Sequence, residues 1–161
     1  MKINQSVPYI LIILIVFLFS TCNVTKEFPP DEHLLIHNKF KISNSKVSSD
    51  ELAGYLKQQP NTKLFGLLRT NIAFYNLGNK GKETKFKKWL RNKVGTPPIL
   101  LDTSLIEVAK KSMLLYLSNK GYFSTNISDS IVYKDRKAIV YYIVKTAKPY
   151  TIQKISLEYH P

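Results

Sequence analysis

The stretch LLYLSNKGYF, residues 114–123, holds the clearest change of local pattern in the chain. Up to Asn119 the apolar residues recur at helical spacing, and from Tyr122 onward they alternate as in a β-strand. Gly121 lies between the two patterns, where a residue with a left-handed backbone commonly ends a helix. The stretch therefore predicts a helix that ends at Gly121 and passes directly into a strand.

The predicted helix begins near Asp102 or Ser104, because either side chain can cap it. Its apolar residues recur at spacings of three and four, which places them on one face. They are Leu105, Val108, Ala109, Met113, Tyr116 and Leu117. We interpret this stripe as part of a hydrophobic core and not as a cofactor site.

Two strands are predicted after the glycine. The first has an apolar face with Phe123, Ile127, Ile131 and Tyr133, and a polar face with Ser124, Asn126, Ser128 and Ser130. After a turn at KDRK (134–137), AIVYYIV (138–144) is a continuous apolar run. Such a run predicts a strand at the centre of a sheet, buried on both faces.

The first half of the chain adds a strand, a short helix and a basic segment. Residues 34–42 alternate as a strand, with Leu34, Ile36, Asn38, Phe40 and Ile42 on one face. Ser48 and Glu51 are spaced as a capping box for a short helix that ends near Pro60. Farther on, FYNLGNKGK (74–82) predicts a turn, and ETKFKKWLRNK (83–93) predicts a short basic amphipathic helix.

The N-terminus has the pattern of a signal peptide. Lys2 precedes an apolar run of 11 residues from Tyr9 to Phe19, which is shorter than the roughly 20 residues of a membrane-spanning helix. A short membrane anchor is the alternative. Cys22, the only cysteine, follows Ser-Thr in a position that resembles a bacterial lipobox. That resemblance implies cleavage before Cys22 and its acylation, and a free thiol in an ordinary signal region is the alternative.

Positive charge dominates the rest of the chain. Removing residues 1–21 takes away one lysine and leaves 23 Lys and Arg against 11 Asp and Glu. Nine of these basic residues lie between Lys63 and Lys93, with Glu83 as the single acid there. Such a balance favours anionic lipid, acidic partners or nucleic acid. A secretion signal argues against nucleic acid, so the charge indicates a membrane surface.

The element order and several motifs resemble a known family. A helix ending in YLSNKGYF, a hairpin and then KPYTIQKISLE resemble a POTRA domain that runs into the first strand of another. QQPNTKLFGLLR, FYNLGNKGK and WLRNKVGTPP are similar to the N-terminal region of lipidated TamA-like proteins of Bacteroidota, within the BamA/TamA outer-membrane assembly superfamily. The resemblance implies an α+β, POTRA-like β-α-α-β-β domain, in which a three-stranded mixed sheet packs on two helices and a basic insertion separates the helices.

The resemblance also implies a domain organisation. Residues 1–21 are the lipoprotein signal peptide, 22–32 a tether, 33–147 the POTRA-like domain with its insertion at about 60–101, and 148–161 the incomplete first strand of a second such domain. Members of the family continue into a C-terminal β-barrel. We therefore expect this chain to be a fragment of a longer protein or the product of a truncated reading frame.

The sequence contains no cluster typical of an enzyme. Histidine occurs only as His33, His37 and His160, and strand spacing separates the first two by about 13 Å. No cysteine or carboxylate cluster joins them, and no nucleophile-elbow, P-loop or dinucleotide-binding motif is present. We expect no catalytic residues, metal, cofactor or small-molecule substrate.

Two binding sites are predicted. The resemblance implies a sheet edge that binds extended clients by β-augmentation, which we assign to Phe123, Ser124, Thr125, Asn126, Ile127 and Ser128. Outward amides are expected at Asn126 or Ser128, with the register deciding between them. A membrane-surface contact is assigned to Lys85, Lys87, Lys88, Trp89 and Arg91. The alternative for this second segment is a solvated lysine-rich insertion with its aromatics tucked against the domain.

The resemblance and these sites together imply a periplasmic scaffold module, lipid-anchored to the outer membrane through Cys22. It would receive extended outer-membrane client chains or other envelope assembly proteins. A stand-alone envelope lipoprotein, which binds a partner or anionic membrane through the basic aromatic segment, is the second hypothesis. A nucleic-acid-binding protein is the third, and acylation of Cys22 would exclude it.

Overall fold

The computed structural model describes residue 29, residues 31–62 and 70–157, and residue 159. The chain divides into two compact units. One consists of residues 30–61 and 99–161, and we call it the sheet unit. The other contains residues 62–98, and we call the described part of that segment the helical unit. The signal peptide and Cys22 lie outside the described residues, and the predicted domain boundaries stay predictions.

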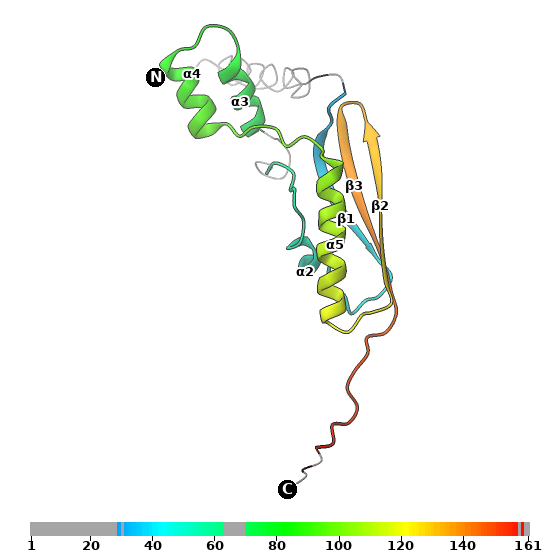
Figure 1. Ribbon diagram of the computed structural model, residues 1–161. Coiled ribbons are helices and arrows are strands. Elements are labelled where there is room, and N and C mark those ends of the chain that lie inside the picture. Colours follow the sequence, from blue (N-terminus) through cyan, green and yellow to red (C-terminus); the bar gives the residue numbers. More distant parts are fainter. Residues whose placement is uncertain (1–28, 30, 63–69, 158, 160–161) are drawn as a thin grey trace, which may run out of the picture. The chain divides into compact units, whose positions relative to one another are not determined.

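The sheet unit is an α+β arrangement (Figure 1). Its elements are β1 (Leu34–Ile42), α2 (Ser49–Ala53), α5 (Thr103–Asn119), β2 (Thr125–Lys134) and β3 (Lys137–Thr146). The strand order is β1-β3-β2, with β1 parallel and β2 antiparallel to β3. The predicted three-stranded mixed sheet packed on two helices is confirmed.

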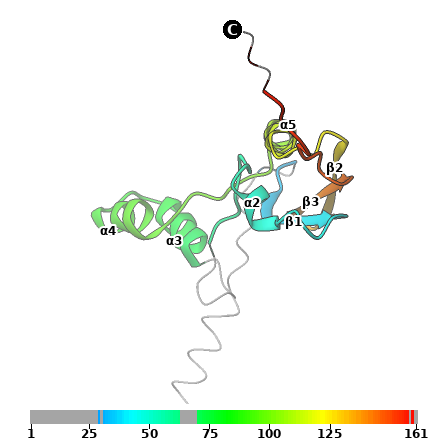
Figure 2. The same ribbon diagram turned by 90° about the horizontal axis from the view of Figure 1, so that it is seen from below.

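Strand β3 lies at the centre of the sheet, as its apolar run predicts. Its side chains alternate between the two faces, and Ala138, Val140, Tyr142 and Val144 are buried against the helices. The intervening residues are only half-buried, so the prediction of burial on both faces is wrong. The reason is that both described helices of this unit, α2 and α5, pack on the same face (Figure 2).

Helix α5 buries one stripe in the core. Ile106, Ala109, Met113 and Leu117 are at most 1% exposed and recur at spacings of three and four. Val108 was expected in this stripe but is 45% exposed. The reason is that the buried face begins at Ile106, and Val108 lies to one side of it. The cap is Asp102, whose Oδ1 accepts from the Ser104 N–H at 2.8 Å.

The end of α5 explains the sharp change of pattern at residue 121. The Tyr122 N–H donates to the Leu117 carbonyl and the Gly121 N–H to the Ser118 carbonyl, both at 2.9 Å. This pair of bonds is a Schellman motif, which needs a left-handed residue, and Gly121 has φ +86°. Tyr122 and Leu117 both lie in the buried core, so the motif joins the helix end to the sheet.

Strand β1 departs from strict alternation. The register with β3 shifts between Leu35 and His37. Leu34 and Leu35 precede this shift, and both are buried. Such a bulge reverses the faces of the residues that follow it. Asn38, Phe40 and Ile42 therefore share one face, as predicted. Phe40 and Ile42 pack against the core, and Leu35 replaces Ile36 as the core residue before the bulge.

Helix α2 is shorter than expected, because it ends at Ala53 and not near Pro60. The Ser48 hydroxyl accepts from the Asp50 N–H, as a cap should. Glu51 does not complete the capping box. Its carboxylate instead accepts the Tyr116 hydroxyl and the Lys120 ammonium from α5, so tertiary contacts outweigh the local motif.

The helical unit contains α3 (Thr70–Asn79), α4 (Lys85–Trp89) and the π-helix η1 (Leu90–Val94). The short helix predicted over residues 83–93 is present as α4 and η1. The turn predicted over residues 74–82 is wrong for its first six residues, which belong to α3. A Cβ at Gly78 would lie 2.7 Å from Arg91 Cβ, so this glycine lets α3 approach η1 closely and serves packing rather than a turn.

Candidate functional site

Strand β2 forms an edge of the sheet, because among the described residues its only strand neighbour is β3. The pairing is antiparallel and runs from Thr125 opposite Thr146 to Lys134 opposite Lys137. The predicted client-binding strand therefore lies where unpaired backbone groups are available. Alternate N–H and C=O groups of β2 point away from β3.

The register identifies the outward amides of β2. The Ala147 N–H donates to the Ser124 carbonyl at 3.2 Å, so these residues form a hydrogen-bonded pair. Such pairs alternate along an antiparallel ladder, which directs the amides of Asn126 and Ser128 toward β3 as well. The expectation of an outward amide at Asn126 or Ser128 is wrong. The outward amides belong to odd-numbered residues such as Ile127.

The other edge of the sheet is partly occupied. The Leu35 N–H of β1 donates to the Ile99 carbonyl at 2.9 Å, and the Leu101 N–H donates to the His33 carbonyl at 2.8 Å. These bonds place the segment before α5 along the first residues of β1. Strand β2 is consequently the freer of the two edges within the described residues.

A shallow groove of about 320 Å³ lies between α5 and this free edge. An extended chain added to β2 would direct alternate side chains into it, since side chains alternate between the two faces of a sheet. Leu114 and Ile127 supply its apolar surface. Its full lining is Glu107, Lys110, Lys111 and Leu114 from α5, and Thr125, Asn126 and Ile127 from β2.

An ion-pair network at the groove connects α5 to β2. Lys110 Nζ lies 2.5 Å from Asp129 Oδ1 and 2.6 Å from Glu107 Oε1. The hydrogen bond to Asp129, and next in size the bond to Glu107, raise the pKa of Lys110. Sequence reasoning missed this network, although an acid between Ile127 and Ile131 on an apolar strand face is a detectable signal of a partner.

The first predicted edge residues precede the strand. Phe123 is 66% exposed, and β2 begins only at Thr125. Thr125 Oγ1 donates to the Tyr122 carbonyl at 2.7 Å and lies 2.8 Å from Thr146 Oγ1, so this side chain closes the end of the ladder. Only the later part of the predicted edge can therefore pair as a strand.

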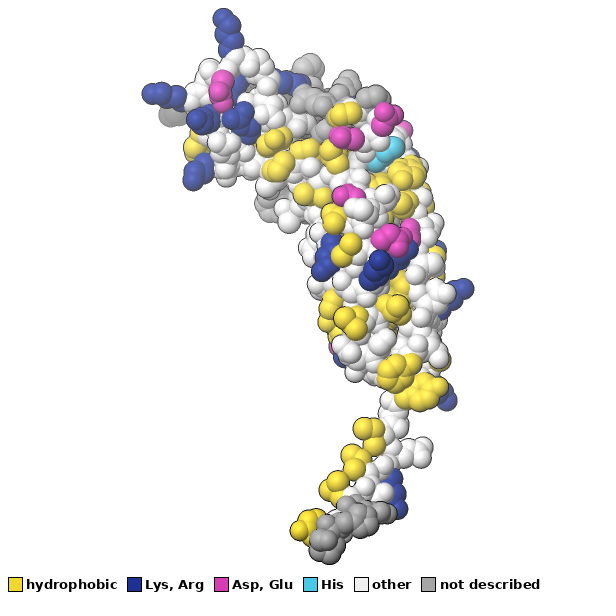
Figure 3. All heavy atoms as spheres, in the orientation of Figure 1, with side chains coloured by type: hydrophobic (Ala, Val, Ile, Leu, Met, Phe, Trp, Pro, Cys, Tyr) yellow, Lys and Arg dark blue, Asp and Glu magenta, His cyan; other side chains and the backbone are white. Residues whose placement is uncertain are grey.

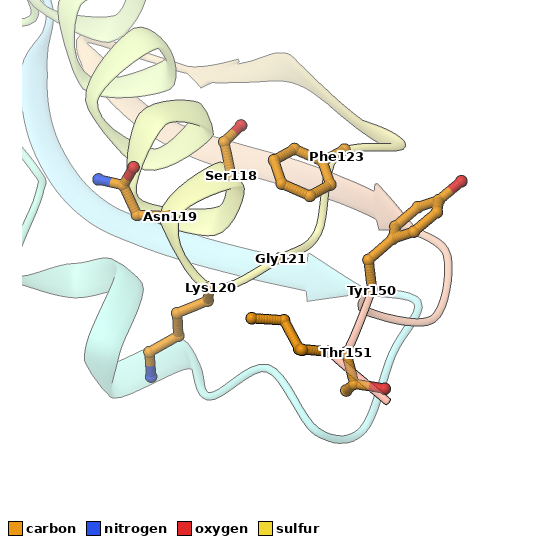
Figure 4. Close-up of a pocket in the computed structure, with 8 residues that line it drawn as sticks. Ser118, Asn119, Lys120, Gly121, Phe123, Tyr150 and Thr151 are labelled. Carbon is orange, nitrogen blue, oxygen red and sulfur yellow. The ribbon is translucent and has the colours of Figure 1, made fainter. Parts of the chain in front are cut away.

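Phe123 lies instead beside Tyr150, where the chain continues beyond the end of β3 (Figure 4). Its ring is 5.7 Å from that of Tyr150, and the Tyr150 N–H donates to the Gly121 carbonyl at 2.9 Å. Beyond Tyr150, residues 151–157 form neither helix nor strand. Their apolar side chains are exposed, with Leu157 at 95%, and they are visible along the exit segment in Figure 3.

The helical unit exposes two aromatic side chains among lysines. Phe86 is 67% and Trp89 53% exposed, and their ring centroids lie 6.0 Å apart. Lys85 and Lys88 are also exposed. Several basic side chains project from this unit on the face that Figure 3 shows. Both rings are thus exposed on the helical unit, whereas the solvated alternative expects them to be tucked against the domain.

The other two predicted membrane contacts are already engaged within the helical unit. Arg91 Nη2 lies 2.9 Å from Glu83 Oε1, and Arg91 Nη1 donates to Asn79 Oδ1 at 3.3 Å. The Lys87 ammonium donates to the Lys80 carbonyl. Arg91 and Lys87 therefore stabilise the unit, and Lys85, Lys88 and Trp89 remain available at its surface.

The described ranges contain neither a candidate metal site nor a candidate membrane-spanning helix. These ranges contain no group of three His, Cys, Asp or Glu that could hold a metal ion. Their helices are also too short or too polar to cross a bilayer.

Comparisons with known proteins give one family match. The family model described as POTRA, surface antigen variable number repeat, matches residues 37–146, which is more than half of the chain. No curated protein matches. Among solved structures, the crystal structure of Haemophilus influenzae BamA POTRA3-5 is similar at 15% sequence identity and a TM-score of 0.30. The match covers 76% of this chain and 70% of that one.

Proposed function

The chain belongs to the POTRA family, and we propose that it is a periplasmic scaffold module of an outer-membrane protein assembly or translocation factor. It receives extended client or partner chains by β-augmentation on β2. The observation that carries this proposal is the free edge of β2 beside the groove against α5. No catalytic step is assigned to it.

In this proposal, an incoming strand pairs with the outward N–H and C=O groups of β2. Main-chain hydrogen bonds supply affinity without regard to client sequence, and the groove accepts alternate side chains. Apolar client side chains contact Leu114 and Ile127, because those residues form the apolar lining. A transmembrane β-strand alternates apolar and polar residues, and such a segment fits this arrangement.

The test is a proline at an outward amide, compared with alanine at the same position. Ile127→Pro removes a donor that a client uses, whereas Ile127→Ala removes the same side chain and keeps the N–H. The free energies of urea unfolding of the two variants should agree within about 1 kcal/mol, because an outward amide makes no bond to β3. Only the proline variant should lose binding of a fluorescent peptide that alternates apolar and polar residues.

Ser128→Pro provides the matched structural control. Its amide points toward β3, so proline there breaks a ladder bond and should destabilise the fold by about 1–3 kcal/mol. If Ile127→Pro binds the peptide as well as Ile127→Ala does, augmentation at β2 is not the mechanism. If Ile127→Pro unfolds like Ser128→Pro, the outward direction of the Ile127 amide is wrong.

We further propose that the module is of the lipidated TamA-like type and is anchored to the periplasmic face of the outer membrane through Cys22. The support is the apolar run of 11 residues from Tyr9 to Phe19, which Ser-Thr-Cys follows directly. Several acyl chains hold a protein at a membrane, where one chain would bind only reversibly. Mass spectrometry of the envelope-extracted protein should show acylated Cys22, and Cys22→Ser should remain unlipidated. Wild-type protein without acyl chains contradicts this proposal.

A second candidate function is contact with anionic membrane through the helical unit, and this contact also carries the alternative of a stand-alone envelope lipoprotein. It is favoured by the exposed, adjacent rings of Phe86 and Trp89 beside Lys85 and Lys88. Aromatic rings favour the headgroup boundary, and each lysine near an anionic surface contributes about 1 kcal/mol.

Vesicle binding tests this second function. Lys85→Gln with Lys88→Gln should weaken binding to anionic vesicles, and Trp89→Ala should weaken it further. Lys134→Gln with Lys137→Gln removes the same charge from the sheet unit and serves as the control. Equal loss in both double variants would show a general charge effect and contradict a specific contact.

A further inference from the structure

The face of the sheet turned away from the helices carries a feature that the edge function does not use. On β3, Tyr141 and Ile143 lie on this face, because their neighbours Val140, Tyr142 and Val144 are buried on the other. They are half-buried although α2 and α5 both pack on the opposite side (Figure 2). The outer face therefore presents an apolar and aromatic row that needs an explanation.

Lysines flank this row from the neighbouring strand. Lys39 is opposite Tyr141 and Lys41 is opposite Ile143 in the parallel register. Their Nζ atoms lie 5.6 and 5.0 Å from the centroid of the Tyr141 ring. Within the described residues, neither lysine forms an ion pair. Both ammonium groups are exposed on the strand and keep hydrogen-bond donors for another molecule.

No acid balances this charge on the outer face of the strands. The three strands contain a single acid, Asp129, and its carboxylate is bound to Lys110 on the helix side. Farther along the same face, Lys134 and Lys137 are directly opposite each other. Like charges placed this way oppose folding, so nearby carboxylates would relieve a repulsion that the isolated unit retains.

We propose that this outer face docks an acidic surface of a partner protein. Carboxylates of the partner pair with Lys39 and Lys41, and an apolar partner side chain covers Ile143 and the edge of the Tyr141 ring. Charge complementarity selects the partner, and the apolar row supplies the buried centre of the contact. The face stays open when a strand adds to β2, so both contacts can form together.

A membrane surface fits this face less well than a protein does. The lysines lie over the Tyr141 ring, and Tyr141 and Ile143 are half-buried. Side chains that enter the headgroup boundary must protrude beyond the lysines, as Phe86 and Trp89 do at 67% and 53% exposure. The outer face has the opposite arrangement, in which charge stands above the apolar row.

The test uses the whole chain and two synthetic peptides as probes, one alternating glutamate with leucine and the other glutamine with leucine. Both can add to the β2 edge, because main-chain pairing ignores the charge of the side chains. Only the glutamate peptide should also shift the side-chain resonances of the Tyr141 ring and the Ile143 methyl groups, which lie on the outer face. Lys39→Gln with Lys41→Gln should remove these shifts and weaken the binding of that peptide at least tenfold, while shifts along β2 persist.

Lys46→Gln with Lys57→Gln changes two exposed lysines outside the strands. It lowers the net charge equally and should leave the Tyr141 and Ile143 shifts unchanged. The proposal is overturned if the glutamate peptide causes no shifts on the outer face. It is also overturned if both double variants weaken the peptide equally, or if the Lys39 and Lys41 variant loses binding to anionic vesicles. Loss of the β2 shifts alone would contradict the augmentation proposal and leave the docking face in place.

Discussion

Gly121 couples two requirements at one position. Its φ of +86° belongs to the left-handed region, and a Cβ added there would lie 2.6 Å from the Tyr150 carbonyl oxygen. Alanine would therefore strain the backbone by about 1–2 kcal/mol and push the exit segment away from the helix end. We expect Gly121→Ala to lower the free energy of unfolding by at least that amount in urea titrations.

Gly54→Ala is the matched control for this prediction. Gly54 has helical dihedrals, and the nearest atom to an added Cβ is at an ordinary contact distance of 3.4 Å. Alanine there should leave stability unchanged or raise it slightly, because it restricts the unfolded chain. Equal midpoints for the two variants would mean that Gly121 is not constrained by the Schellman motif or by Tyr150.

Glu51 provides a pH-dependent contribution to stability. The Tyr116 hydroxyl donates to it at 2.6 Å and Lys120 Nζ lies 3.0 Å away. The hydrogen bond from Tyr116 has the larger effect and the bond from Lys120 the next. Together they lower the pKa of Glu51 below its ordinary value of 4.5. A group with a lowered folded pKa stabilises the fold above its unfolded pKa, and the effect is lost as pH falls through the folded pKa.

We therefore expect Glu51→Gln to lower the Tm at neutral pH. The difference from wild type should shrink as pH falls below about 4.5. Thermal melts across this range measure it. Asp135→Asn removes one carboxylate from an exposed turn with φ 54°, which Asn also tolerates, and should show no such convergence. A Tm difference that is constant with pH would contradict the role of the Glu51 carboxylate.

At the level of elements, local pattern predicted what local physics determines. The bounds of β1, the central place of β3 and the end of α5 at Gly121 follow from periodicity and from one glycine. The bulge in β1, the register of β2 and the core-facing side of α5 depend on contacts with distant residues, so a single sequence could not provide them. Helix α3 was missed because its glycine and asparagines resemble a turn until η1 packs against them.

The candidate site likewise had one feature that the sequence predicts and another that depends on contacts between distant residues. An edge strand after α5 was predictable from element order and family resemblance. Its usable amides were not, because they depend on the pairing of Ser124 with Ala147. The apolar run at 138–144 predicted a central strand. The half-exposed positions of Tyr141 and Ile143 in it were not predictable, because they depend on both helices packing on the other face.

The core face of α5 yields a direct test at this scale. Leu117 is fully buried and joins the cluster with Tyr142 and Val144, whereas Leu115 on the same helix is 65% exposed. Leu117→Ala should lower the free energy of unfolding by about 2–5 kcal/mol. Leu115→Ala should change it by less than about 0.5 kcal/mol. Similar values for the two variants would contradict the orientation of α5.

At the scale of the whole molecule, the sheet unit brings the two ends of the helical insertion together. The Ile99 N–H donates to Asn61 Oδ1 at 2.8 Å. Next to it, the buried Gln58 side chain donates to the Asp102 carbonyl at 2.7 Å and accepts from the Asp102 N–H at 3.1 Å. These bonds belong to the sheet unit alone, so the ends of the insertion can stay adjacent without residues 62–98.

We therefore expect that replacing residues 62–98 with a short Gly-Ser linker leaves the sheet unit folded. A shorter loop lowers the entropic cost of closing the loop by about 2 kcal/mol or less. The Tm should therefore stay unchanged or rise slightly. The shortened protein should keep peptide binding at β2 and lose binding to anionic vesicles, because Phe86, Trp89 and their lysines are gone.

A second variant, Gln58→Ala in the shortened protein, should lower the Tm, since Asp102 then loses both of its bonds to the Gln58 side chain. A shortened protein that fails to fold cooperatively would show that the sheet unit depends on the insertion, and one that still binds vesicles would place the membrane contact elsewhere in the chain.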